Sequence, residues 1–93
     1  MATKRGATPM DPATRAIQVG VGARIRSRRL RAKLSQEQVA HDAEMDSKRF
    51  QRLELGMVNA TINTLARVAR ALGTDYWTLL GARPPARMSR APR

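Results

Sequence analysis

Apolar residues recur along this chain at intervals of three, four and seven positions, the spacing of one face of an α-helix. One set, expected on a helix from about residue 14 or 17 to residue 33, comprises Ile17, Val21, Ile25 and Ala32. A second set, ending at Gly73, comprises Ile62, Leu65, Ala69 and Leu72. No segment shows the period-two alternation of a half-buried strand. The pattern therefore predicts an all-α fold.

Residues 35–56, between these two sets, predict two short helices separated by a tight connection. Ser35 and Gln38 form an S-x-x-Q pattern, in which each side chain satisfies a backbone N–H at the start of a helix. Asp46 belongs to the residue class preferred as an N-cap, so a second helix is expected to follow it. Gly56 can supply the left-handed residue that ends this helix.

The second short helix has two chemically different faces. At about 100° per residue, Phe50 and Leu53 point to one side of it. Polar side chains point to the opposite side, with Ser47 beside them: Lys48, Gln51 and Arg52. The helix therefore combines an apolar anchor with a basic, amide-bearing outer face.

Two more helices complete the expected fold of five. Thr61 is expected to cap the helix that carries the second apolar set, and Asp75 to cap a short last helix that ends at Gly81.

The domain is expected to occupy residues 16–81. Residues 1–15, in which Pro9 and Pro12 discourage helix, are expected to form a flexible N-terminal arm. Residues 82–93 are expected to form a basic disordered tail.

The net charge of the chain indicates a class of binding partner. Eighteen Lys and Arg residues against seven Asp and Glu residues leave a formal charge of +11 on 93 residues. Self-repulsion of this size favours a polyanionic partner, most commonly nucleic acid. The alternative is an Arg-rich composition without a binding role, to which the two tails contribute.

Other classes of function lack the residues they need. The chain has no cysteine, and the single His41 cannot form a metal site unaided. We find no nucleophile–base set, paired carboxylates or phosphate-binding glycine loop, so we expect neither an enzyme nor a cofactor or small-molecule ligand. No apolar run reaches the roughly 18 residues of a membrane span, and the N-terminus lacks a secretory signal, which predicts a cytoplasmic protein.

Several ordered fragments share the spacing of one known family: Ile25-Arg26, Ser35–Ala40 (SQEQVA), Leu53–Gly56 (LELG), Ile62–Gly73 and Asp75 with Leu79-Leu80. In this order they resemble the Cro/C1-type (XRE) family of phage-repressor-like helix-turn-helix regulators, over roughly residues 21–80. The resemblance implies a five-helix domain in which helices 2 and 3 form the helix-turn-helix.

Four positions depart from the family pattern. Glu44 replaces the usual glycine of the turn, so either a non-glycine residue adopts a positive φ there or the turn differs. Lys33 replaces another common glycine, and Met45 stands where valine is usual. Arg28 occupies an apolar position, so its stem is expected to pack while its head reaches solvent.

The resemblance also implies roles for individual residues. Helix 3 of such a motif enters the major groove, and helix 2 lies across the backbone. The expected base contacts are Ser47, Lys48 and Arg52, with Gln51 as a secondary candidate. The expected phosphate contacts are Gln36, Arg49, Asn59 and Asn63. Arg29 and Glu54 are expected to form a structural ion pair between helices 1 and 3.

A single domain contacts few base pairs, and the family binds palindromes as two-fold dimers. Tyr76, Trp77 and Leu80 offer the best apolar seam for a homodimer. The alternative is that Tyr76 and Leu80 only close the core. The expected function is sequence-specific binding of double-stranded DNA by a transcriptional regulator, most simply a repressor. The alternatives are an antitoxin that binds a toxin and regulates its own operon, and a restriction-modification controller.

Overall fold

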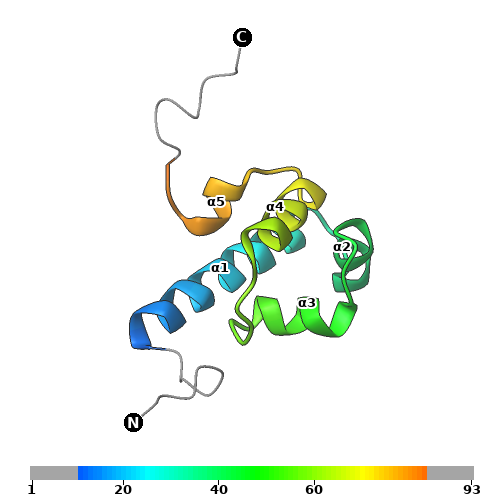
Figure 1. Ribbon diagram of the computed structural model, residues 1–93. Coiled ribbons are helices and arrows are strands. Elements are labelled where there is room, and N and C mark those ends of the chain that lie inside the picture. The colour runs from blue at the N-terminus through cyan, green and yellow to red at the C-terminus, as the bar shows by residue number, and fades with distance from the viewer. Residues whose placement is uncertain (1–10, 84–93) are drawn as a thin grey trace.

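The computed structural model describes residues 11–83 and confirms the all-α prediction. The described residues form five helices, which are labelled in Figure 1: α1 (Pro12–Arg31), α2 (Gln36–Asp42), α3 (Ser47–Glu54), α4 (Ile62–Ala71) and α5 (Tyr76–Leu80). Residues 11–83 contain no strand. The arm at residues 1–10 and the tail at residues 84–93 lie outside the described part of the chain.

The first helix begins earlier than expected. The side chain of Asp11 caps it, with Oδ1 accepting from the Thr14 N–H at 2.7 Å. Pro12 occupies the first helical position, where the missing N–H costs nothing and the fixed φ already suits a helix. The interpretation of Pro12 as a residue that discourages helix was therefore wrong, and residues 12–15, which were expected in the N-terminal arm, belong to α1.

One core joins the helices. Its fully buried larger side chains are Phe50, Ile25, Leu79, Val39 and Val68. The sequence predicted Ile25 and the α3 anchor correctly, but three predicted core positions are exposed: Ile17, Ala32 and Ile62. They lie at or near helix ends, where the helical period continues beyond the part of the helix that has a neighbour.

The short helices begin where their capping residues stand. Ser35 and Gln38 form a reciprocal capping box, and Asp46 accepts from the Arg49 N–H at 3.1 Å. Thr61 and Asp75 cap α4 and α5 in the same way. The hydrogen bond from the Thr78 N–H is the main cause that lowers the pKa of the Asp75 carboxyl. All four caps were predicted.

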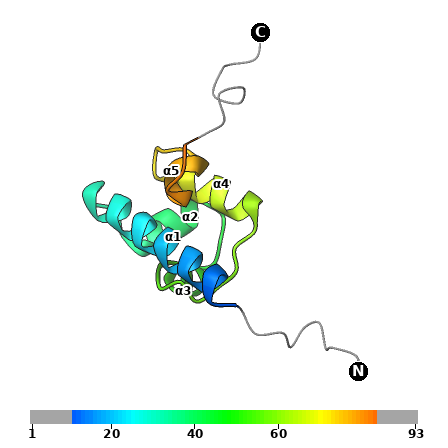
Figure 2. The same ribbon diagram turned by 90° about the vertical axis from the view of Figure 1, so that its left-hand side faces the viewer.

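Helix α1 runs between α3 and α5, with α3 below it and α5 above it in both views (Figures 1 and 2). Gly22 permits the close approach of α3, because a Cβ at this position would lie 2.5 Å from the Glu54 carbonyl oxygen. The glycine that weakens an isolated α1 is therefore required by its packing.

The turn between α2 and α3 places Glu44 in the left-handed region, at φ 58°. This resolves the two alternatives for the missing glycine: a non-glycine residue adopts the positive φ. Lys33, at the other common glycine position, does the same at φ 60°. Such a conformation costs roughly 1–2 kcal/mol per non-glycine residue.

Replacing Glu44 with glycine is therefore expected to stabilise the domain. Relief of strain is offset in part by the greater entropy of the unfolded chain, which leaves a gain of about 0.5–1 kcal/mol. In thermal unfolding this corresponds to a rise in Tm of roughly 2–8 °C. Glu44→Ala removes the same charge but keeps a Cβ, so it should not produce the gain. Equal Tm values for the two variants would contradict the strain argument.

Candidate nucleic-acid interface

The helix-turn-helix is held together by its inner face. Val39 and Ala40 of α2 are buried against Phe50 and Leu53 of α3, in one apolar cluster. Ala43 at the end of α2 is also fully buried. Because these contacts use the inner side of α3, its opposite side is left to solvent.

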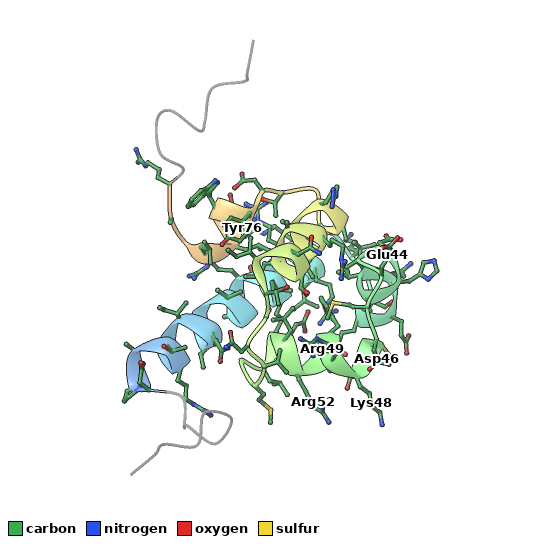
Figure 3. All side chains as sticks on the ribbon, viewed as in Figure 1. Glu44, Asp46, Lys48, Arg49, Arg52 and Tyr76 are labelled. Carbon is green, nitrogen blue, oxygen red and sulfur yellow. The ribbon has the colours of Figure 1, made fainter. Side chains whose placement is uncertain are left out.

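The outer face of α3 carries the expected base readers. Lys48, Gln51 and Arg52 are exposed, and Ser47 is partly buried in the first turn. Figure 3 shows Lys48 and Arg52 extending from the underside of α3, away from the other helices. Within residues 11–83, neither cation forms an ion pair. The helix therefore presents two cationic side chains that have no ion-pair partner among the described residues.

A buried network fixes the C-terminal end of α3. Glu54 receives a hydrogen bond from Arg29 Nε at 2.6 Å on Oε2, and another from an Arg29 terminal nitrogen at 3.1 Å on Oε1. The predicted ion pair is thus present, and both side chains are more than nine-tenths buried. The hydrogen bond to Glu54 raises the pKa of Arg29, and Arg29 also donates to the Leu34 carbonyl at 3.1 Å.

Gln36 joins this network, a contact that the sequence did not predict. Its Nε2 donates to Glu54 Oε1 at 2.9 Å, so one carboxylate connects α1, α2 and α3. A primary amide carries two N–H donors, and only one is used here. The second donor of Gln36 is available for the expected phosphate contact.

The other expected phosphate contacts lie on α3 and on the two segments that follow it. Arg49 lies about 100° around the helix from Phe50, and it is exposed. Asn59 is exposed in the loop between α3 and α4, and Asn63 is exposed in the first turn of α4. The positions are thus distributed over α3, the loop that follows it and the first turn of α4.

The expected dimer seam is only half exposed. Tyr76, Trp77 and Leu80 are all partly buried, and the two rings meet edge to face with centroids 5.4 Å apart. Tyr76 and Leu80 pack against the core, as the alternative interpretation holds.

Larger apolar exposure lies beside α5. Ile17 and Ile62, 58% and 69% exposed, border a depression of ≈ 190 Å³ together with Tyr76 and Leu80. This apolar depression was not predicted, because Ile17 and Ile62 were assigned to the core.

Two further findings concern the described residues alone. No helix within residues 11–83 has the length and apolarity to cross a membrane. The same residues contain no group of three or more His, Asp or Glu side chains that could hold a metal ion.

Comparison with solved structures identifies similar proteins. The restriction-modification controller protein C.AhdI from Aeromonas hydrophila is 30% identical, with a TM-score of 0.67, over 69% of this chain and 97% of that one. The clp gene regulator ClgR from Corynebacterium glutamicum is 25% identical, with a TM-score of 0.67, over 69% and 68% of the two chains. The hypothetical transcription factor NHTF from Neisseria, 23% identical with a TM-score of 0.68, shares the fold over 88% of this chain and 93% of that one.

The sequence itself matches the model of a helix-turn-helix domain family over residues 21–76, which is more than half of the chain. No match was found among curated protein sequences. The family match contains α2, α3 and the turn between them, whose inner face is packed and whose outer face is cationic. The chain therefore belongs to the helix-turn-helix family and is a DNA-binding transcription regulator of the Cro/C1 type.

Proposed function

We propose that this regulator binds a palindromic operator as a homodimer and represses transcription there. The observation that carries the proposal is the outer face of α3, where Lys48 and Arg52 are exposed and unpaired within the described part of the chain. DNA as the partner favours a cytoplasmic location. A compact domain seated at a promoter excludes other proteins from it, which favours repression over activation.

The base-reading roles follow from the chemistry of the α3 face. Arg and Lys donate to O6 and N7 of guanine in the major groove, so a G·C pair is expected beneath Arg52 or Lys48. Gln51 is exposed on the same side and suits an adenine edge. Ser47 lies in the first turn of α3, the end that recognition helices direct toward bases.

Phosphate contacts would set the orientation of the domain on the duplex. Gln36 supports this role with its spare amide donor, at the beginning of α2. Arg49 is exposed on α3 itself, and Asn59 and Asn63 are exposed on the loop and the helix that follow it. Since Glu54 accepts a hydrogen bond from Gln36, the proposed contact of Gln36 with the DNA backbone would depend on the same network that holds the end of α3.

A second copy of the chain is proposed to cover the apolar depression. Ile17 and Ile62 are large apolar side chains exposed to solvent, which does not stabilise a monomer. Both border the same depression as Tyr76 and Leu80. We therefore extend the proposed seam from Tyr76, Trp77 and Leu80 to include these two isoleucines. A two-fold contact here would place two recognition helices on one operator.

One alternative has a specific observation in its favour. The similarity to C.AhdI, a restriction-modification controller protein, extends over 97% of that chain. A controller would use the same α3 face and the same dimer, so the alternative changes the regulated genes and not the interface. The antitoxin alternative has no comparable support.

Selection of bound sequences from random double-stranded DNA tests the proposal. We expect a palindrome with half-sites centred about one helical turn apart, roughly 10 base pairs, each containing at least one G·C pair under α3. Sedimentation of the complex should show two protein chains per site. Recovery of sequences with no common motif would contradict sequence-specific binding. A motif without two-fold symmetry would contradict the dimer alone.

A further inference from the structure

Three arginines form a stripe along the side of α1 that faces away from α3. Arg24, Arg28 and Arg31 follow the i, i+4, i+7 spacing of one helical face. At about 100° per residue they lie on average roughly 150° around α1 from Gly22, where the α3 backbone makes contact. Figure 2 shows the C-terminal half of α1 rising away from α3 toward the level of α5. This arginine stripe is therefore separate from the recognition face.

The first member of the arginine stripe is held in a fixed position. Arg24 Nε donates to the Leu79 carbonyl oxygen of α5 at 2.8 Å. A Cβ at Gly81 would lie 2.7 Å from Arg24 Cζ, and one at Gly20 would lie 3.2 Å from a terminal nitrogen. Two glycines thus leave space for this guanidinium, whose terminal nitrogens have no hydrogen-bond partner within residues 11–83. A guanidinium fixed in this way loses little entropy when it binds an anion.

The arginine stripe borders two depressions between α1 and the C-terminal helices. One, of ≈ 190 Å³, is lined by Arg24, Ser27, Arg28, Arg31 and Thr78. The other, of ≈ 240 Å³, is lined by Arg28, Arg31, Ala32 and Leu72. Since Arg28 and Arg31 border both, the two depressions are neighbours with a shared cationic wall, and we refer to them together as the groove.

The positive charge of this groove is not neutralised locally. No carboxylate among the described residues lies within 4.0 Å of a guanidinium of the arginine stripe. Asp75 at the start of α5 is near enough for Arg28 to contribute to its lowered pKa, but hydrogen bonds from Thr78 are its main partners. The arginine stripe extends about 10 Å along the helix axis, at 1.5 Å per residue. An extended polyanion fits it better than a single small anion.

We propose that the arginine stripe binds the phosphate backbone of a second DNA duplex while α3 holds the operator. The inference rests on the proposed function for the first duplex. Guanidinium groups pair with phosphate oxygens through parallel N–H donors, and a row of them along a helix suits a row of phosphates. Because the recognition face and the arginine stripe lie on different sides of α1, one protein molecule would connect two duplexes.

A capture assay tests this connection. Protein is loaded on immobilised operator duplex, and a fluorescent duplex of unrelated sequence is then added. We expect the parent protein to retain the fluorescent duplex and Arg28→Gln/Arg31→Gln to retain at least about tenfold less, since each lost phosphate contact removes about 0.9 from the log–log salt slope. Arg15→Gln/Arg70→Gln removes two charges from other exposed positions of α1 and α4, so it should retain the duplex as the parent does.

The outcomes separate the two proposals. Failure to load on the operator would contradict the proposed function, because α3 carries that step. In that case the arginine stripe is tested directly. The fluorescent duplex is titrated into Lys48→Ala/Arg52→Ala, and the amide chemical shifts of residues 24–31 show whether the duplex binds there. Normal loading without capture would overturn the second-duplex proposal. Equal capture by the two double variants would also overturn it, since it would assign the effect to net charge alone.

Discussion

Glu54→Ala is expected to destabilise the domain by about 3–5 kcal/mol, because it leaves the Arg29 guanidinium buried without its counter-charge. The substitution also removes the acceptor of Gln36, so contacts of α3 with both α1 and α2 are lost together. In thermal unfolding of a domain of this size, the loss corresponds to a decrease in Tm of at least roughly 12 °C. Operator affinity should decrease in parallel, since Glu54 fixes the end of the recognition helix.

Three comparisons identify the cause of this loss. Glu37→Ala removes the same charge from an exposed position of α2, and it should change the free energy of unfolding by less than about 0.5 kcal/mol. Glu54→Gln keeps one carbonyl acceptor and should lie between the parent and Glu54→Ala. Arg29→Met/Glu54→Leu removes both charges and should recover part of the stability. If Glu54→Ala unfolds at the same temperature as Glu37→Ala, the network does not hold the helices together.

The elements that the sequence predicted well are those determined by nearby residues. Ser35, Asp46, Thr61 and Asp75 each cap a helix through a backbone N–H three positions ahead, a contact that needs no tertiary structure. The same rule applies at Asp11, which was overlooked because Pro12 was interpreted as a helix breaker. That error came from neglecting the one helical position that proline suits.

The misses come from contacts between residues far apart in the chain. Periodicity assigned Ile17 and Ile62 to the core, but both are exposed. The period of apolar residues does not show where a helix extends beyond the elements that pack against it. The contact between Arg24 and the Leu79 carbonyl joins residues 55 positions apart, and no local pattern in the sequence indicates it. Resemblance to a family predicted the Arg29 and Glu54 pair, whereas the addition of Gln36 became visible only once the helices were placed.

The difference between local and long-range contacts affects the proposed base readers less than the proposed dimer seam. The predicted base readers follow from their angle around α3, which the local sequence determines, and from the burial of Phe50 on the opposite side of the helix. Only the burial of Phe50 depends on tertiary structure. The dimer seam depends instead on which side chains three different helices, α1, α4 and α5, leave uncovered. The structure therefore changes the proposed seam, by adding Ile17 and Ile62, and leaves the proposed base readers unchanged.

Arg52→Ala is expected to leave the fold intact and to reduce discrimination between operator and unrelated DNA. The side chain is exposed and unpaired among the described residues, so Tm should change little. Loss of a bidentate contact to guanine costs about 1–3 kcal/mol of discrimination, or roughly 5- to 150-fold in the ratio of the two affinities. The loss of affinity relative to the parent should be largest on operators that retain the G·C pair. When that pair is replaced, the parent also lacks the contact, so the two proteins should bind more equally.

Measurement of both affinities at one salt concentration separates base reading from general attraction. Arg70→Ala removes the same charge from an exposed position of α4 that contacts no DNA in the proposal, so it should preserve the ratio of the two affinities. Arg52→Ala should instead lower operator affinity far more than affinity for scrambled DNA. If Arg52→Ala preserves the ratio as Arg70→Ala does, Arg52 contacts no base, and the assignment of the α3 outer face to the major groove would have to be abandoned at this position.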